Sequence, residues 1–200
     1  MINVFFRYII TTESRAHPYG ALKETERKGT MTTRVIEIPE TGLLKDFLYN
    51  AIYLPEGAEP PPREILNRPE LRVYYDDFGS GRADRCIAAL DGGRIVGLVW
   101  SRIMHDYGHI DDQTPSLAIS VSEGYRERGI GTGLMEQMLE LLCSLGYRKV
   151  SLAVQKANYA VKMYSKLGFE TVDENEEEYI MLRMLQHADQ KEDYGFLKQQ

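Results

Sequence analysis

A cluster of glycines and arginines near the middle of the chain is the segment best suited to bind a ligand. Residues 121–135 read VSEGYRERGIGTGLM and join a strand-like run to a helix-like run through the pattern Arg-x-x-Gly-x-Gly-x-Gly, which begins at Arg126. Glycines at a helix start let the backbone approach a ligand, and the first N–H groups of a helix have no partner within it. Three such glycines cost roughly 1 kcal/mol each relative to alanine. We interpret the segment as an anion cradle, with Arg126 and Arg128 adding positive charge; a capped helix start with solvated arginines is the alternative.

Two familiar phosphate-binding loops do not fit this segment. A P-loop needs a lysine directly after its last glycine, but Gly129 is followed by Ile130. A dinucleotide fingerprint needs Gly-x-Gly-x-x-Gly, and its last position is Leu134 or Glu136, depending on which glycine begins it. The acidic residue that would contact a ribose after the next strand is also missing, because Gln155 stands there. The letters therefore argue against both loops.

A third phosphate pattern does fit. Arg126, Gly129 and Gly131 match Gln/Arg-x-x-Gly-x-Gly/Ala, which resembles the acetyl-CoA signature of the GNAT superfamily of N-acetyltransferases. The later block NYAVKMYSKLGF, residues 158–169, is similar to the family's second block and lies at the usual distance downstream. The resemblance covers roughly residues 33–185. It implies acetyl-CoA as co-substrate.

The resemblance also implies a fold: α/β (α+β), with a mixed, mostly antiparallel sheet of about six to seven strands, about four flanking helices, and a V-shaped splay between the central parallel strands. Hydrophobic periodicity and turn signals predict a compatible order of elements. The expected strands are 33–38, 86–90, 94–104, 116–121, 150–154, 169–172 and 179–185. The expected helices are 42–53, a second after Pro62, one after the glycines that ends at Gly146, and 158–167. The segment 105–113 is expected to be an exposed connection.

The resemblance assigns roles to individual residues around the cradle. The pyrophosphate of acetyl-CoA would sit on main-chain amides at the head of the helix, and the strand before it, which the family bulges, would bind the pantetheine arm through its backbone at Val121 and steady an oxyanion. Asn158 occupies a position that contacts the pantetheine region, although an N-cap asparagine explains it equally well. The expected donor-binding residues are Val121, Arg126, Glu127, Arg128, Gly129, Ile130, Gly131, Thr132, Gly133 and Asn158.

Tyr164 is the catalytic residue that the resemblance implies, as the acid that protonates the departing thiolate. A phenol is protonated at neutral pH and can donate as the sulfur becomes negative. The alternative is a core tyrosine, because Tyr164 also falls on an apolar helix stripe.

The general base is not evident: many relatives carry a glutamate at the position that aligns with Ser116. Asp111, Asp112, His105, His109 and Glu123 are the nearby candidates. Neither cysteine has a partner for nucleophilic catalysis, so direct attack by the amine is expected, and no metal is required.

Charge suggests the acceptor. The turn 173–178, DENEEE, is acidic at all but one position and, in this family, the final hairpin often borders the acceptor cleft. It would attract a cationic amine, whereas a solvated hairpin tip is the plainer interpretation. The net charge of −6 argues against nucleic acid as a partner. Homodimers are common in the family, but no residue here argues for one.

Composition fits one globular domain, with 43% hydrophobic and 27% charged residues. We expect residues 31–186 to form this domain, 1–30 to be an N-terminal extension, and 187–200 to be a polar tail. We hypothesise that Met31 is the true start; a genuine extension that packs on the domain or on a partner is the alternative. The apolar opening is too short to span a membrane, and two cysteines make no disulfide framework, so a cytoplasmic protein is expected.

The leading function is an acetyl-CoA-dependent N-acetyltransferase. The alternatives are a non-catalytic acyl-CoA-binding module, motivated by Ser116, and a nucleotide-binding oxidoreductase, which the failed fingerprint disfavours.

Overall fold

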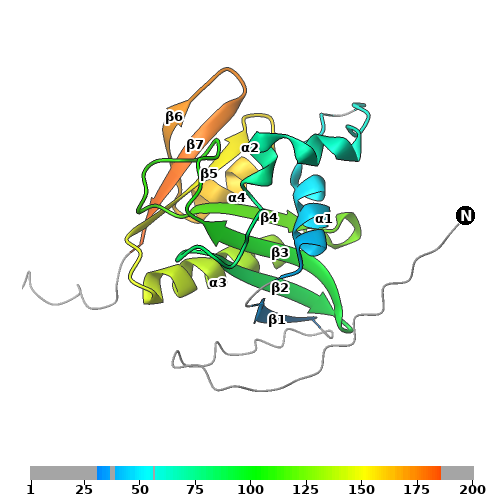
Figure 1. The fold of residues 1–200 in the computed structure, drawn as a ribbon, viewed down its shortest axis with the longest axis horizontal. Coiled ribbons are helices and arrows are strands. Elements are labelled where there is room, and N and C mark those ends of the chain that lie inside the picture. The colour runs from blue at the N-terminus through cyan, green and yellow to red at the C-terminus, as the bar shows by residue number, and fades with distance from the viewer. Residues whose placement is uncertain (1–30, 37–38, 56, 186–200) are drawn as a thin grey trace, which may run out of the picture.

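The computed structural model describes residues 31–36, 39–55 and 57–185 (Figure 1). The predictions for residues 1–30 and 187–200 lie outside these ranges, and the division into an extension, a domain and a tail stays a prediction. The strands are β1 Met31–Ile36, β2 Arg85–Asp91, β3 Arg94–Arg102, β4 Ser116–Val121, β5 Lys149–Gln155, β6 Glu170–Glu174 and β7 Glu178–Met184. The helices are α1 Thr41–Ala51, α2 Pro69–Arg72, α3 Ile130–Ser144 and α4 Ala160–Lys166, with 3-10 turns η1 Arg63–Asn67 and η2 Glu123–Tyr125.

The seven strands form one sheet in the order β1-β2-β3-β4-β5-β7-β6. Every neighbouring pair is antiparallel except β4 and β5, which run parallel. That pair meets at a single register position, Ser116 opposite Ser151, so the two strands separate toward their carboxyl ends. The predicted mixed sheet with a splay between its central parallel strands is therefore confirmed.

Helices cover both faces of the sheet, and the strand residues alternate between them (Figure 1). In β2, Ile87 and Ala89 pack in the core under α3 and α4, whereas Cys86 and Ala88 pack in the core under α1 and η1. The apolar stripe of α3 faces the first of these cores, with Leu134, Met135, Met138, Leu139, Leu141 and Leu142 buried. Two packed layers of helix on one sheet thus hold β4 and β5 in place.

Local signals explain where several elements end. Gly92 and Gly93 both have positive φ in the turn between β2 and β3, as the predicted hairpin requires. Gly146 (φ 88°) follows α3 and Gly168 (φ 79°) follows α4, which are the left-handed positions that end helices. Within the described ranges no helix is both long and apolar enough to cross a bilayer.

Three local expectations were wrong. The second helix is instead a 3-10 turn and a single helical turn, because Pro69 forces Arg68 into an extended conformation (φ −66°, ψ 140°) between them. β4 pairs with β3 from Ser116 to Val121 without a register shift, so this pairing contains no bulge. The segment 105–113 is only partly exposed, since Gly108 is buried against β5.

Candidate active site

A groove of about 1860 Å³ passes through the splay between β4 and β5. Its lining includes Leu117, Ile119 and Val121, which belong to the core under α3, and Ala118 and Ser120 from the intervening positions of β4. Alternate residues of a strand point to opposite faces, so the groove reaches both sides of the sheet at this one place. Its volume exceeds the 300–1,000 Å³ of typical ligand pockets. The groove is therefore large enough for a long ligand and a second molecule that meets it.

The amino end of α3 opens into this groove. Gly129 has φ 79° and immediately precedes the helix, whose first internal bond runs from Gly133 N to Gly129 O (3.0 Å). The N–H groups of Ile130, Gly131 and Thr132 therefore have no partner within the helix. No side chain caps this end, and its first turn holds no acidic residue. Uncapped amides with the positive end of the helix dipole are suited to bind phosphate.

The glycine at 131 keeps the mouth of the cradle open. A Cβ built there would lie 3.6 Å from Met163 Sδ and 3.8 Å from Val121 Cγ2, which are ordinary contacts. The space therefore admits a methyl group but little more. Gly133, in contrast, has nothing within 4 Å of the added Cβ and faces open space. Of these two glycines, only Gly131 lines the groove.

The two arginines of the cradle are placed differently. Arg126 lines the groove, and its Nε donates a hydrogen bond to the carbonyl oxygen of Val121 (3.0 Å), so its side chain ties the loop to the end of β4. Arg128 lies over the ring of Tyr125, 5.3 Å from its centroid, and does not line the groove. Glu127 lines the groove with φ 60°, a left-handed conformation that is uncommon outside glycine. With the side chains in these positions, an anion at this end of α3 would be met chiefly by the main chain.

Tyr164 belongs both to the core and to the groove lining, so its position is compatible with a packing role and with a catalytic role. The side chain is 8% exposed, packs edge to face on Phe169 with ring centroids 5.9 Å apart, and also lines the groove. Burial raises the pKa of its hydroxyl above the ordinary value, and Tyr159 adds to the increase. The hydroxyl therefore remains protonated at neutral pH, as an acid requires.

Asn158 lies at the start of α4 and also lines the groove. Its Oδ1 accepts a hydrogen bond from the N–H of Ala160 (2.9 Å), a contact of the capping type. The helix thus uses the carboxamide oxygen, and a contact to the pantetheine arm would come from the amide nitrogen.

A half-buried carboxylate contacts Tyr74, a residue of the groove lining, from the segment that was expected to be exposed. Asp106 Oδ2 accepts hydrogen bonds from Ser116 Oγ (2.6 Å) and from the hydroxyl of Tyr74 (2.9 Å). Its other oxygen, Oδ1, is buried without a hydrogen-bond partner among the described residues. Burial raises the pKa of Asp106, and the two hydrogen bonds partly oppose the increase. Ser116 therefore stands beside a carboxylate, although it carries none itself.

Sequence reasoning missed Asp106. Its partners lie 10 and 32 residues away in the chain, on β4 and after α2, and no periodicity marks such contacts. Gly108 was the available signal: a Cβ there would lie 2.9 Å from Ala153 N and Leu152 C, so only glycine lets the segment pack against β5.

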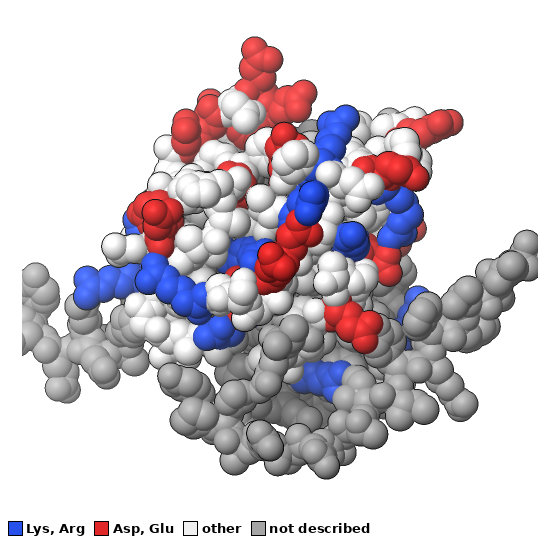
Figure 2. All heavy atoms as spheres, in the orientation of Figure 1, with Lys and Arg blue, Asp and Glu red and all other residues white. Residues whose placement is uncertain are grey.

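A second carboxylate faces the groove directly. Glu178 begins β7 opposite Gln155 at the end of β5, and both residues line the groove. Burial raises the pKa of Glu178, the hydrogen bond with Asn175 lowers it, and the charges of Glu177 and Asp106 raise it further. Sequence reasoning treated this residue only as part of an acidic turn. Figure 2 shows acidic side chains gathered at the tip of the β6–β7 hairpin, at the top of the view.

The candidate bases proposed from sequence are not brought together at the groove. Asp111 is held by Lys149 (2.6 Å) and Thr114 (2.6 Å), which lower its pKa. His105, His109 and Asp112 cluster on the same loop. Of the five candidates, only Glu123 lines the groove.

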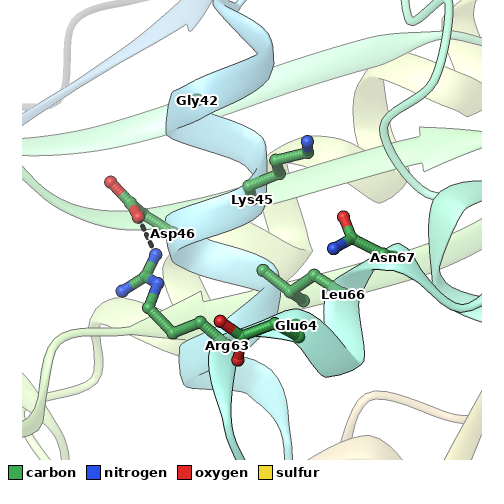
Figure 3. A pocket seen from close by; sticks show the side chains of 7 residues that line it. All are labelled: Gly42, Lys45, Asp46, Arg63, Glu64, Leu66 and Asn67. Atoms are coloured by element: carbon green, nitrogen blue, oxygen red, sulfur yellow. Dashed lines mark hydrogen bonds and ion pairs between the residues drawn. The ribbon is translucent and has the colours of Figure 1, made fainter.

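A smaller hollow lies between α1 and η1, and Figure 3 shows Asp46 and Arg63 paired across it. Arg63 also lies over the ring of Tyr49, 4.9 Å from the centroid. These contacts fasten η1 to α1, which is a structural role.

Comparisons with known proteins bear on the family and the fold. The model of the acetyltransferase (GNAT) family matches residues 51–169. An N-alpha-acetyltransferase of Sulfurisphaera tokodaii is 31% identical over 119 residues, covering 54% of this chain and 70% of that protein. Mycothiol acetyltransferase of Pseudarthrobacter chlorophenolicus is 25% identical over 155 residues, covering 71% of this chain but 48% of that protein, so the chain spans about half the length of this relative. A PaiA N-acetyltransferase from Thermoplasma acidophilum, solved in complex with coenzyme A, has the same fold, with a TM-score of 0.55, 16% identity, and coverage of 76% of this chain and 98% of that one.

Proposed function

Because the chain belongs to the acetyltransferase (GNAT) family, we propose that it transfers the acetyl group of acetyl-CoA to a primary amine of a small molecule or peptide, directly within a ternary complex. One observation carries this proposal: a single groove through the β4–β5 splay contains the uncapped amino end of α3, Tyr164 and Glu178. Donor and acceptor entering from opposite faces of the sheet would meet between these groups.

The donor half rests on the cradle. The amides of Gly129 to Thr132 would meet an anion with no competing carboxylate in the first turn of α3, so a pyrophosphate suits them by charge and by hydrogen bonding. The pantetheine arm would run along the unpaired edge of β4 toward the point where the strands separate. Main-chain N–H groups on that edge would then donate to the oxyanion that forms on the thioester carbon.

The chemistry needs one acid and one base. The neutral amine nitrogen attacks the thioester carbon, a C–N bond forms, and the C–S bond breaks. Tyr164 gives its proton to the departing thiolate, and Glu178 accepts the proton that the nitrogen sheds, directly or through a water molecule. The raised pKa of Glu178 makes it a stronger base than an ordinary glutamate. Solvent then restores both groups.

The acceptor is proposed to carry positive charge. Glu177 and Glu178 line the groove beside the acidic hairpin, and Asp106 lies behind Tyr74 at the same end. A cationic amine would offset this concentration of negative charge.

A turnover assay tests the proposal. Purified protein is incubated with acetyl-CoA and a panel of amines that includes a diamine, a polyamine, an aminoglycoside and a peptide with a free amino terminus, and thiol release is measured. We expect turnover of at least one cationic amine, together with thermal stabilisation by acetyl-CoA and coenzyme A but not by NADH. Binding of acetyl-CoA with no turnover on any amine would instead support the non-catalytic module that Ser116 suggests.

Glu178→Gln tests the base. Because burial, Glu177 and Asp106 raise the pKa of Glu178, the basic form is lost at a higher pH than the ordinary value of about 4.3. We expect kcat/KM to fall as pH decreases through this raised pKa, and the Gln variant to lose about 10²-fold in kcat/KM and this acidic limb of the profile. Glu176→Gln on the exposed turn is the matched control and should keep the limb. An unchanged profile in Glu178→Gln would assign the base elsewhere.

A further inference from the structure

Three potential metal ligands converge on the loop between β3 and β4. One ligand atom from each of His105, His109 and Asp112 lies within 4.8 Å of the others. The two imidazole rings contact each other with centroids 4.3 Å apart and a tilt of 48°, and His109 Nε2 lies 4.0 Å from Asp112 Oδ1. Two imidazoles and a carboxylate form a donor set that suits zinc and related divalent transition metals.

The orientation of His109 is the observation that points to a cation. Its Nδ1 lies 2.9 Å from the carbonyl oxygen of Met104, and a carbonyl can only accept, so Nδ1 carries the proton. In the neutral ring, Nε2 then carries a lone pair, which faces the carboxylate of Asp112. These two acceptor atoms, 4.0 Å apart, are placed so that one metal ion between them could bind both. Metal-binding histidines are typically held in this way, with the second ring nitrogen donating to a carbonyl or carboxylate.

The loop that carries these ligands is anchored to β4 and β5. Gly108 packs against the backbone of β5, Asp111 pairs with Lys149, and Asp106 accepts a hydrogen bond from Ser116. An ordered loop loses little conformational entropy when its side chains bind an ion. Arg82 donates to the main-chain oxygen of Asp112, and the carboxylate of Asp112 faces His109.

The distances require only side-chain movement. Two ligands of a tetrahedral zinc ion with bonds near 2.0 Å are about 3.3 Å apart. The 4.8 Å spread therefore has to close by roughly 1.5 Å, and His105 and Asp112 are exposed and able to rotate. We propose that His105, His109 and Asp112 form a binding site for one divalent transition-metal ion, with its remaining position open to water.

Titration of the full chain with cobalt tests this site. Protein stripped of metal with a chelator is titrated with Co²⁺, followed by its visible absorption bands, and then challenged with Zn²⁺. We expect one Co²⁺ per chain, displaced by Zn²⁺, with no thiolate charge-transfer band because Cys86 and Cys143 are not ligands. His105→Ala and Asp112→Asn should each weaken binding at least about tenfold, while Gln113→Ala on the same loop should not.

The two remaining histidines provide the decisive control. His17 and His187 lie outside the described residues, and a double His17→Ala, His187→Ala variant should bind Co²⁺ like the unmodified chain. Loss of binding in that variant, or undiminished binding in both His105→Ala and Asp112→Asn, would overturn the proposal. So would the absence of any stoichiometric Co²⁺ binding, which would make the cluster an ordinary ion pair between His109 and Asp112.

Discussion

Tyr164 shows how one residue can serve both the core and the groove. Its ring packs on Phe169 within the core under α3 and α4, and the same side chain lines the groove through the splay. Burial raises the pKa of its hydroxyl, so the group is held in the protonated form that a general acid needs. A catalytic role and a packing role are therefore compatible, and only a change that removes the hydroxyl while keeping the ring can separate them.

Tyr164→Phe makes that separation. We expect kcat to fall about 10²-fold or more, which is the usual contribution of a general acid, while the dissociation constant for acetyl-CoA stays within about twofold. Thiol-release kinetics and calorimetric titration measure the two quantities. Tyr159→Phe is the matched control, because Tyr159 also lines the groove but is 60% exposed. Undiminished turnover in Tyr164→Phe would leave Tyr164 as a core residue only.

The residues at the site differ in how far the sequence could predict them. The positions of Gly129 and Gly131 at the head of α3 followed from a local motif, because a helix start is a local structure. Asp106 and Glu178 could not be found in this way: Asp106 is placed by Ser116 and Tyr74, and Glu178 by its pairing with Gln155 across strands. Such contacts depend on the path of the whole chain, and local propensity does not contain that path.

At the scale of the elements, the cradle depends on keeping the first turn of α3 free of side-chain bulk. Gly131→Glu would place a carboxylate among the amides that are proposed to bind phosphate, so repulsion and bulk both oppose the donor. We expect binding of coenzyme A to be lost in calorimetric titration. Gly131→Ala is the matched control: its Cβ makes only ordinary contacts, and the exchange removes roughly 1 kcal/mol of helix penalty, so the variant should fold at least as stably and still bind. Unchanged affinity in Gly131→Glu would refute the cradle.

The loop before β4 has no room for a side chain at Gly108, whereas α3 has room for a methyl group at Gly131. A Cβ at Gly108 would lie 2.9 Å from backbone atoms of Leu152 and Ala153, which cannot move without distorting β5. We expect Gly108→Ala to cost about 1–3 kcal/mol of unfolding free energy, as overpacking does, and to raise KM for the amine because the loop carries Tyr107 into the groove. Denaturant unfolding and steady-state kinetics measure these effects. Gly42→Ala in α1, where a Cβ meets nothing within 4 Å, should be neutral or stabilising; equal stability of the two variants would contradict the packing argument.

Elements with strong local signals were predicted well, and those decided by packing were not. The turn Asp91-Gly92-Gly93 predicted the β2–β3 hairpin, and the stripe of leucine and methionine residues predicted α3. The helix expected after Pro62 failed because Pro69 interrupts it, although the sequence showed that proline. The loop 105–113 looked exposed because it is polar, yet Asp106 bonds to Ser116 and Tyr74, and Asp111 bonds to Lys149.

Across the whole molecule, the groove joins two different electrostatic surroundings. The free amides and dipole at the amino end of α3 favour an anion, whereas Glu177 and Glu178 line the groove on the β6–β7 hairpin and favour a cation. Acidic side chains gather at the top of the view in Figure 2, where the tip of this hairpin lies. The net charge of −6 adds a weaker attraction for cations over longer distances. A chain with this arrangement should respond to salt differently for different acceptors.

A diamine and a monoamine of the same chain length test this expectation. The second ammonium group of the diamine interacts with the acidic end of the groove through solvent, where salt screens charges over about 10 Å at 0.1 M. We expect kcat/KM for the diamine to fall by at least about threefold between low and moderate salt, and that for the monoamine to change less. In a triple variant with Glu174, Glu176 and Glu177 changed to Gln, the diamine should lose this extra salt dependence. If both amines respond alike in the unmodified chain, the hairpin is a solvated tip, and the acceptor is selected by shape within the groove.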